Sequence, residues 1–106
     1  MFTREQDIEE FLDEYRRSRV IIETTVRATL NKVLKFEDKF QKPFYEFSKE
    51  EVLKVFTSFH TISIISLQNS NLLLKHISRW IIDKKKLNIK STYEDITKNQ
   101  LQTCVD

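Results

Sequence analysis

The sequence of 106 residues contains no glycine, and its single proline is Pro43. Tight turns between β-strands need residues with positive φ, a region that glycine occupies without steric cost. A chain without glycine is therefore expected to consist of helices joined by polar connections. The length corresponds to one domain, residues 1–106. The sequence predicts an all-α fold, a compact bundle of four to five helices.

Hydrophobic periodicity locates the first two helices. The apolar residues between Ile8 and Tyr15 follow helical spacing, which predicts a first helix over about residues 4–15. Thr3 is the predicted N-cap of this helix, and acidic residues in its first turn complement the helix dipole. A second helix is expected over about residues 20–40, where the apolar residues again share one face.

The segment "QKPFYEF" interrupts the helical pattern at Pro43, and its aromatic residues are expected to fill the gap between helices. The third helix carries the clearest local signal. Ser48 and Glu51 have the spacing of a capping box, in which each side chain bonds to the backbone of the other residue. A helix is therefore predicted to start at Ser48.

A fourth helix is expected to begin between Ser63 and Ser66 and to continue to about Lys85. The segment "TISIIS" has high β propensity, but the chain offers no partner strand. We interpret it as a loop that enters the fourth helix. Thr97 is then the predicted N-cap of a short fifth helix near the C-terminus.

The residue inventory argues against catalysis and against cofactors. The two histidines and the single cysteine, Cys104, do not have the spacing of a metal site. Without glycine there is no phosphate-binding loop of the nucleotide-binding type. The sequence lacks a secretory signal and any apolar run of about 18 residues. We expect a cytoplasmic protein that is not an enzyme, binds no cofactor and does not enter a membrane.

Binding remains as the expected activity, and the polar sides of two helices indicate the ligand. On the second helix Arg27, Asn31 and Lys35 recur every four residues and so share one stripe. Arginine, asparagine and glutamine can form paired hydrogen bonds with base edges, whereas lysine contacts phosphate. The alternative is that these are ordinary exposed residues. The fourth helix has a similar polar side, formed by Gln68, Lys75 and Arg79, with Asn69 and Asn71 close to it near the helix start.

The order of the helices is similar to that of a known module. An acidic helix with "EEFLDEY" precedes "TVRATLNKVLKFEDKF", then "FYEFSKEEVLKVFTSF" and "SLQNSNLLLKHISRWIIDKKKL". This order resembles the N-terminal, SAM-like core-binding domain of phage integrases, the tyrosine recombinases, including integrase-like proteins of phages that serve as repressors. The resemblance implies that the second and fourth helices approach the major groove of duplex DNA.

Carried onto this chain, the resemblance implies a set of DNA contacts and excludes strand cleavage. The catalytic domain of the recombinases has no counterpart in these residues, so the chain by itself is not expected to cut or join DNA. Lys84, Lys85 and Lys86 are the implied phosphate contacts at the rim. The implied contacts of the two helices are Arg27, Asn31, Lys35, Ser66, Gln68, Asn69, Lys75 and Arg79.

Two functions therefore remain open. The first is a DNA-binding module of an integrase-like phage or mobile-element protein, either a recombinase clamp domain or a non-catalytic repressor. The alternative is a protein-interaction module that binds a second domain, a recombinase or a phage regulator. Its contact surface would be apolar, around residues 20–22 or the C-terminal "LQTCV". DNA binding should weaken steeply with salt, whereas an apolar contact should not.

Overall fold

The computed structural model describes residues 3–16 and 23–106, and these residues form helices connected by short loops. No strand occurs within these two ranges, so the predicted all-α class is confirmed. The predicted start of the second helix, at residues 20–22, lies outside the described residues, and its predicted end at Phe40 is confirmed. The elements are α1 (Glu5–Arg16), α2 (Glu23–Phe40), the 3-10 helix η1 (Phe44–Glu46), α3 (Lys49–Thr57), α4 (Ile64–Lys84), the 3-10 helix η2 (Thr92–Asp95) and α5 (Lys98–Gln102).

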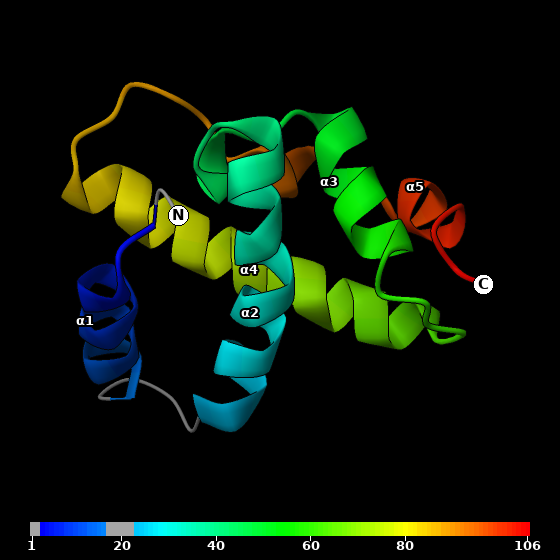
Figure 1. The fold of residues 1–106 in the computed structure, drawn as a ribbon, viewed down its shortest axis with the longest axis horizontal. Coiled ribbons are helices and arrows are strands. Elements are labelled where there is room, and N and C mark those ends of the chain that lie inside the picture. The colour runs from blue at the N-terminus through cyan, green and yellow to red at the C-terminus, as the bar shows by residue number, and fades with distance from the viewer. Residues whose placement is uncertain (1–2, 17–22) are drawn as a thin grey trace.

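The longest helix, α4, runs across the whole molecule, and the other helices pack around it. In Figure 1, α2 crosses in front of α4, α1 lies near the C-terminal half of α4, and α3 and α5 lie near its N-terminal half. The molecule measures 34 × 30 × 21 Å. Its shortest dimension corresponds to about two helix diameters, so two layers of helices account for the thickness.

The core forms where α4 meets the other elements. Leu74, Ile77 and Ile81 of α4 are at most 1% exposed, as their helical spacing predicts. The segment after α4 completes this core, because Tyr93 of η2 and Leu101 of α5 are both buried. The fold is therefore a bundle of five α-helices over the described residues, with η2 as an element that periodicity does not reveal.

A buried carboxylate joins the N-terminal segment to α2 and overturns one prediction. Glu37 accepts hydrogen bonds from the backbone nitrogen of Thr3 at 3.0 Å and from that of Phe44 at 2.9 Å. The Thr3 hydroxyl also donates to Glu37, at 2.5 Å. Thr3 is thus not the N-cap of α1, as predicted, because its side chain satisfies the buried Glu37 instead.

The predicted capping signals of the later helices are confirmed. Ser48 accepts from the backbone nitrogen of Glu51 at 3.2 Å, and Glu51 accepts from that of Ser48 at 2.9 Å. Thr97 and Gln100 form an equivalent capping box at the start of α5. The "TISIIS" segment is a loop that leads into α4, and Ser63 caps that helix.

Left-handed turns are made without glycine. Gln41, His60 and Lys86 have φ of 55°, 50° and 54°, shortly after the ends of α2, α3 and α4. Glycine is the usual residue at such positions, because other residues adopt this conformation at a cost of about 1 kcal/mol. The absence of glycine therefore predicted helices correctly but did not exclude left-handed helix ends. Within the described residues no helix is long and apolar enough to cross a membrane.

Candidate nucleic-acid interface

The exposed side of α2 carries three lysines. Because Val26, Leu30 and Val33 are buried, the opposite side of the helix faces solvent, and there Lys32, Lys35 and Lys39 project. Lys32 Nζ lies 4.9 Å from the centre of the Phe59 ring, and Lys39 Nζ lies 5.5 Å from that of Phe36. Within the described part of the chain none of the three lysines forms an ion pair.

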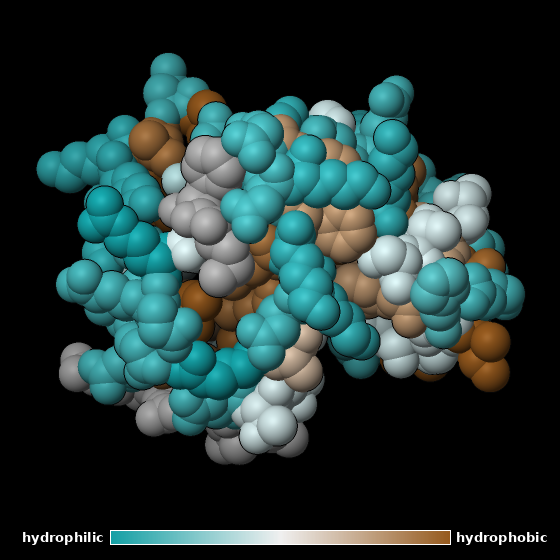
Figure 2. Space-filling model, viewed as in Figure 1, coloured by the Kyte–Doolittle hydropathy of each residue, from teal (hydrophilic) through white to brown (hydrophobic). Residues whose placement is uncertain are grey.

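Figure 2 shows the same face as a space-filling surface. Hydrophilic side chains cover much of it, and apolar side chains are visible between them. The exposed residues of α2 are Thr24, Thr25, Ala28, Asn31, Lys32, Lys35, Asp38 and Lys39. We call Lys32, Lys35 and Lys39 the α2 lysine row. Charges arranged in this way, three and four residues apart, can reach successive phosphates of one nucleic-acid strand.

Arg27, the first residue of the predicted α2 stripe, has protein partners. Its guanidinium bonds to Glu5 Oε1 at 2.7 Å, to Glu23 Oε1 at 3.1 Å and also to Glu9. The hydrogen bond that Arg27 donates to Glu5 is the main reason that the pKa of Arg27 is raised, followed by those that it donates to Glu23 and Glu9. The same bond from Arg27 lowers the pKa of Glu5. Arg27 thereby joins α1 to α2, and its charge is surrounded by carboxylates.

The start of α4 lies beside Lys32, the first member of the α2 lysine row. A hollow between the two helices is lined by Lys32, Ser66, Ser70 and the loop residues 59–62. Ser63 caps α4, accepting from Ser66 N at 3.2 Å, and the first turn contains no acidic residue. The positive end of the α4 dipole is therefore not compensated by a carboxylate of that turn. The N-terminus of α4 and the ammonium group of Lys32 thus lie near one hollow, and both favour anions, while the Asp106 carboxylate lies 3.3 Å from His60 on its rim.

The other predicted residues of α4 face a different side. Gln68, Asn69 and Lys75 line a hollow between α4 and the η2–α5 segment. Arg79 Nε lies 3.3 Å from Glu94 Oε1, the carboxylate of an η2 residue. Ser66 does not line this hollow; together with Ser70 it lines the hollow beside Lys32. The predicted α4 set is therefore divided between two sides.

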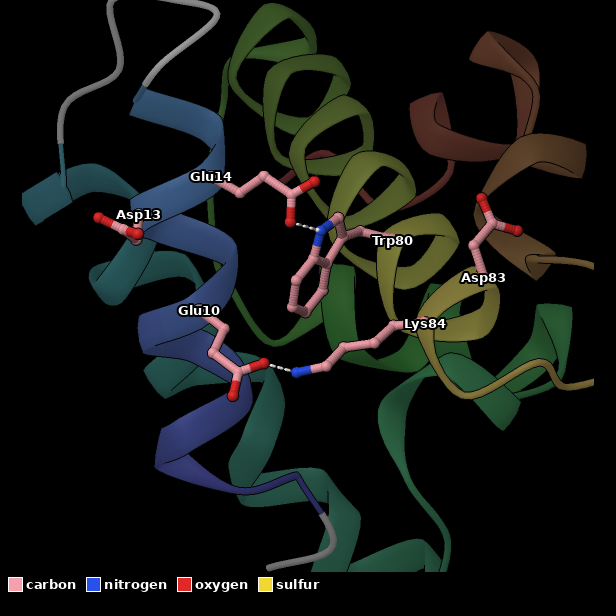
Figure 3. A pocket seen from close by; sticks show the side chains of 6 residues that line it. All are labelled: Glu10, Asp13, Glu14, Trp80, Asp83 and Lys84. Atoms are coloured by element: carbon pink, nitrogen blue, oxygen red, sulfur yellow. Dashed lines mark hydrogen bonds and ion pairs between the residues drawn. The ribbon is translucent and has the colours of Figure 1, made fainter.

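The lysines at the end of α4 lie close to the acids of α1. Lys84 pairs with Glu10, and its Nζ lies 3.9 Å from Asp7 Oδ1 and 4.9 Å from the centre of the Trp80 ring. Lys85 Nζ lies 3.6 Å from Asp7 Oδ2, while Lys86 follows the helix with a positive φ. Figure 3 shows Glu10 and Glu14 of α1 pointing toward Lys84 and Trp80. At this end of the molecule the lysines of α4 therefore lie next to carboxylates of α1.

The predicted contacts therefore separate into four groups. Asn31, Lys35 and Ser66 lie on or next to the α2 face, Arg27 lies in the carboxylate cluster, Gln68, Asn69, Lys75 and Arg79 lie toward η2, and Lys84, Lys85 and Lys86 lie at the end of α4 near α1. Sequence reasoning missed Lys32 and Lys39. Their spacing to Lys35, three and four residues, was the signal that could have identified them.

Comparison with known proteins gives one match. Residues 1–84 match the family model described as "MrpR, N-terminal core-binding domain". No curated protein and no solved structure matches the chain. The match covers most of the 106 residues, and a core-binding domain suggests a DNA-binding module of integrase-like context. The resemblance to a core-binding domain is thus confirmed, and the chain belongs to the family of MrpR N-terminal core-binding domains.

Proposed function

We propose that this chain binds duplex DNA with the exposed side of α2 and the start of α4, without catalysing a reaction. The observation that supports the proposal is the α2 lysine row, of which Lys32 lies beside the N-terminus of α4, whose first turn contains no acidic residue. Lysines without carboxylate partners lose little protein–protein attraction when they bind phosphate, and they release counterions from the DNA. Membership of a core-binding family supports the same ligand.

The dimensions of α2 suit the major groove. A helix with its side chains is about 10–12 Å wide, and the major groove of B-DNA is about 12 Å wide. With α2 in the groove, the lysine row would contact phosphates, while the exposed Asn31 could pair with an adenine edge. Ser66 and Ser70 would contact the backbone from the start of α4.

The remaining predicted contacts have a smaller expected role in this arrangement. A phosphate would have to compete with three carboxylates for Arg27 and with acids of α1 for Lys84. Gln68, Asn69, Lys75 and Arg79 would reach DNA only if the duplex also contacted the η2 side of α4. We therefore expect DNA affinity to depend more on Lys32 and Lys35 than on Lys75 and Arg79.

In a longer protein such a domain would serve as one half of a clamp around DNA. That protein would be either a phage integrase or an integrase-like repressor, and it would act in the cytoplasm. The competing role is a protein-interaction module. Of its two proposed surfaces, residues 20–22 lie outside the described residues. In the C-terminal "LQTCV", Leu101 and Cys104 are each 2% exposed, so this segment packs mainly within the chain itself.

The test is the salt dependence of binding to a labelled DNA duplex. Each phosphate contact contributes about −0.9 to the slope of log affinity against log salt concentration. Three phosphates neutralised by the lysine row predict a slope of about −3. If the chain showed no binding to duplex DNA at low salt, or a binding that salt left unchanged, the proposed function would be wrong.

A further inference from the structure

Ile62 is the most exposed large apolar side chain of the described residues. Its exposed fraction is 84%, compared with 65% for Ile65 and 43% for Ile89. It lies in the loop before α4 and lines the same hollow as Lys32 and Ser66. An isoleucine in this position lies beside Lys32 and the start of α4, which favour an anionic ligand, and its side chain is available for an apolar contact with that ligand.

The loop that carries Ile62 is held in place from both sides. Asp106 N donates to the backbone oxygen of Thr61 at 2.9 Å, and Asp106 Oδ2 lies 3.3 Å from His60 Nδ1. On the other side, Ser63 N donates to Thr61 Oγ1 at 3.1 Å. Ile62 is therefore presented to solvent by a loop with defined hydrogen bonds, which lowers the entropic cost of using it for recognition.

We propose that Ile62 contacts thymine methyl groups in the major groove and gives the domain a preference for particular T-containing sequences. This inference rests on the proposed DNA binding and specifies one of its determinants. The thymine C5 methyl group is the apolar feature of the major-groove edge, and apolar side chains contact it in sequence-specific complexes. The lysine row would bring the duplex to the hollow, and Ile62 would then distinguish the base pairs that it meets.

The test replaces thymine by deoxyuridine, which removes the methyl group and keeps base pairing. A duplex selected by the protein from a random pool is made in both forms, and the affinity of each is measured. Burial of one methyl group changes affinity about fourfold, so we expect the parent to bind the thymine form about fourfold more tightly. Ile62→Ala should bind both forms with nearly equal affinity.

Ile89→Ala provides the matched control. Ile89 is also an exposed isoleucine, but it follows the far end of α4, a helix of 21 residues that spans about 30 Å. This variant should keep the full preference of the parent. Since dU substitution also alters DNA flexibility, the difference between parent and Ile62→Ala carries the result.

Two outcomes overturn the inference and leave DNA binding intact. The parent could bind the two duplexes equally, or Ile62→Ala could keep the fourfold preference, in which case the exposed side chain serves another contact, such as a protein partner. Absence of any DNA binding by the parent would instead reject the proposed function, and the role of Ile62 with it. All variants are checked for native helicity by circular dichroism.

Discussion

Thr3 and Glu37 are joined by two hydrogen bonds across 34 residues of sequence, one from the Thr3 backbone nitrogen and one from its hydroxyl. Together with the bond from Phe44 N, they place a carboxylate with 0% exposure beneath the start of the chain. Glu37 therefore fixes the N-terminal segment and the Pro43 turn to the same helix. The α2 lysine row lies on the opposite side of that helix.

Replacing Glu37 by alanine should lower the free energy of unfolding by about 3 kcal/mol, because buried donors of Thr3 and Phe44 would lose their acceptor. Denaturant unfolding followed by circular dichroism measures the loss. Glu46→Ala is the control, an exposed glutamate whose removal should change stability by no more than about 0.5 kcal/mol. A loss below about 1 kcal/mol for Glu37→Ala would mean that the hydrogen bonds of the carboxylate to Thr3 and Phe44 contribute little to stability.

Arg27→Met should lower stability at neutral pH, because three glutamates would lose their shared cation. The pKa of Glu5 is lowered in the folded protein, mainly by its hydrogen bond to Arg27. A lowered folded-state pKa stabilises the protein above the pKa of the unfolded chain, and this contribution disappears as the pH falls through the folded-state value. The difference between Arg27→Met and the parent should therefore shrink at strongly acidic pH.

Lys35→Met is the matched control for this experiment, since it lies two turns further along α2 and forms no ion pair within the described residues. Its effect on stability should be small and should not depend on pH in the acidic range. An equal, pH-independent loss in both variants would show that side-chain packing, not the ion pairs of Arg27, is responsible.

Trp80→Ala should weaken the packing of α1 against α4. Trp80 Nε1 donates to Glu14 Oε2 at 2.8 Å, and its ring packs edge-on against Phe11 at 5.7 Å (Figure 3 shows the Glu14 contact). Because the ring is only partly buried, we expect a loss of about 2 kcal/mol, below the range for fully buried tryptophan. Trp80→Phe should lose about half as much, since it can keep the aromatic contact.

Circular dichroism is the appropriate measurement for these variants, because Trp80 is the only tryptophan of the chain. Equal stability of Trp80→Ala and the parent would show that the contacts of Trp80 with Phe11 and Glu14 do not stabilise the packing of α1 on α4. Glu14→Gln tests whether the charge of Glu14 matters, because glutamine keeps an acceptor for the Trp80 indole and removes the charge.

Much of the fold could be predicted from local sequence signals. The Ser48 and Thr97 capping boxes and the apolar spacing of α4 depend on residues close together in sequence, and they were read correctly. Thr3 was assigned wrongly because the partner that decides its role, Glu37, is 34 residues away. A sequence pattern identifies the residues that share one face of a helix, but it does not identify which other element of the fold packs against that face.

For the same reason, the sequence alone could not show which of the predicted DNA contacts lie together in the folded protein. The spacing of Gln68, Lys75 and Arg79 correctly indicates one side of α4, and only the packing of η2 and α5 shows that this side is not the one next to Lys32. Likewise, the sequence predicted Arg27 as a DNA contact because it does not show that Glu5 and Glu9 of α1 pack against this residue. The lysines of the α2 row could have been found from their spacing alone.

The most direct measurement compares two double variants that remove the same charge. Lys32→Ala/Lys35→Ala removes two members of the α2 lysine row, and Lys49→Ala/Lys54→Ala removes two exposed lysines of α3. Duplex DNA affinity is measured over a salt series for both variants and the parent. We expect the first variant to bind more weakly and to reduce the steepness of the salt dependence by about 2, one for each lost phosphate contact.

The α3 variant should retain nearly the slope and affinity of the parent, apart from a small general effect of its lower charge. If both variants lost affinity equally, binding would reflect overall charge, and if Lys32→Ala/Lys35→Ala bound as well as the parent, α2 would not be the DNA-contacting helix. Either result would contradict the central proposal, whereas a loss confined to the α2 variant would support it.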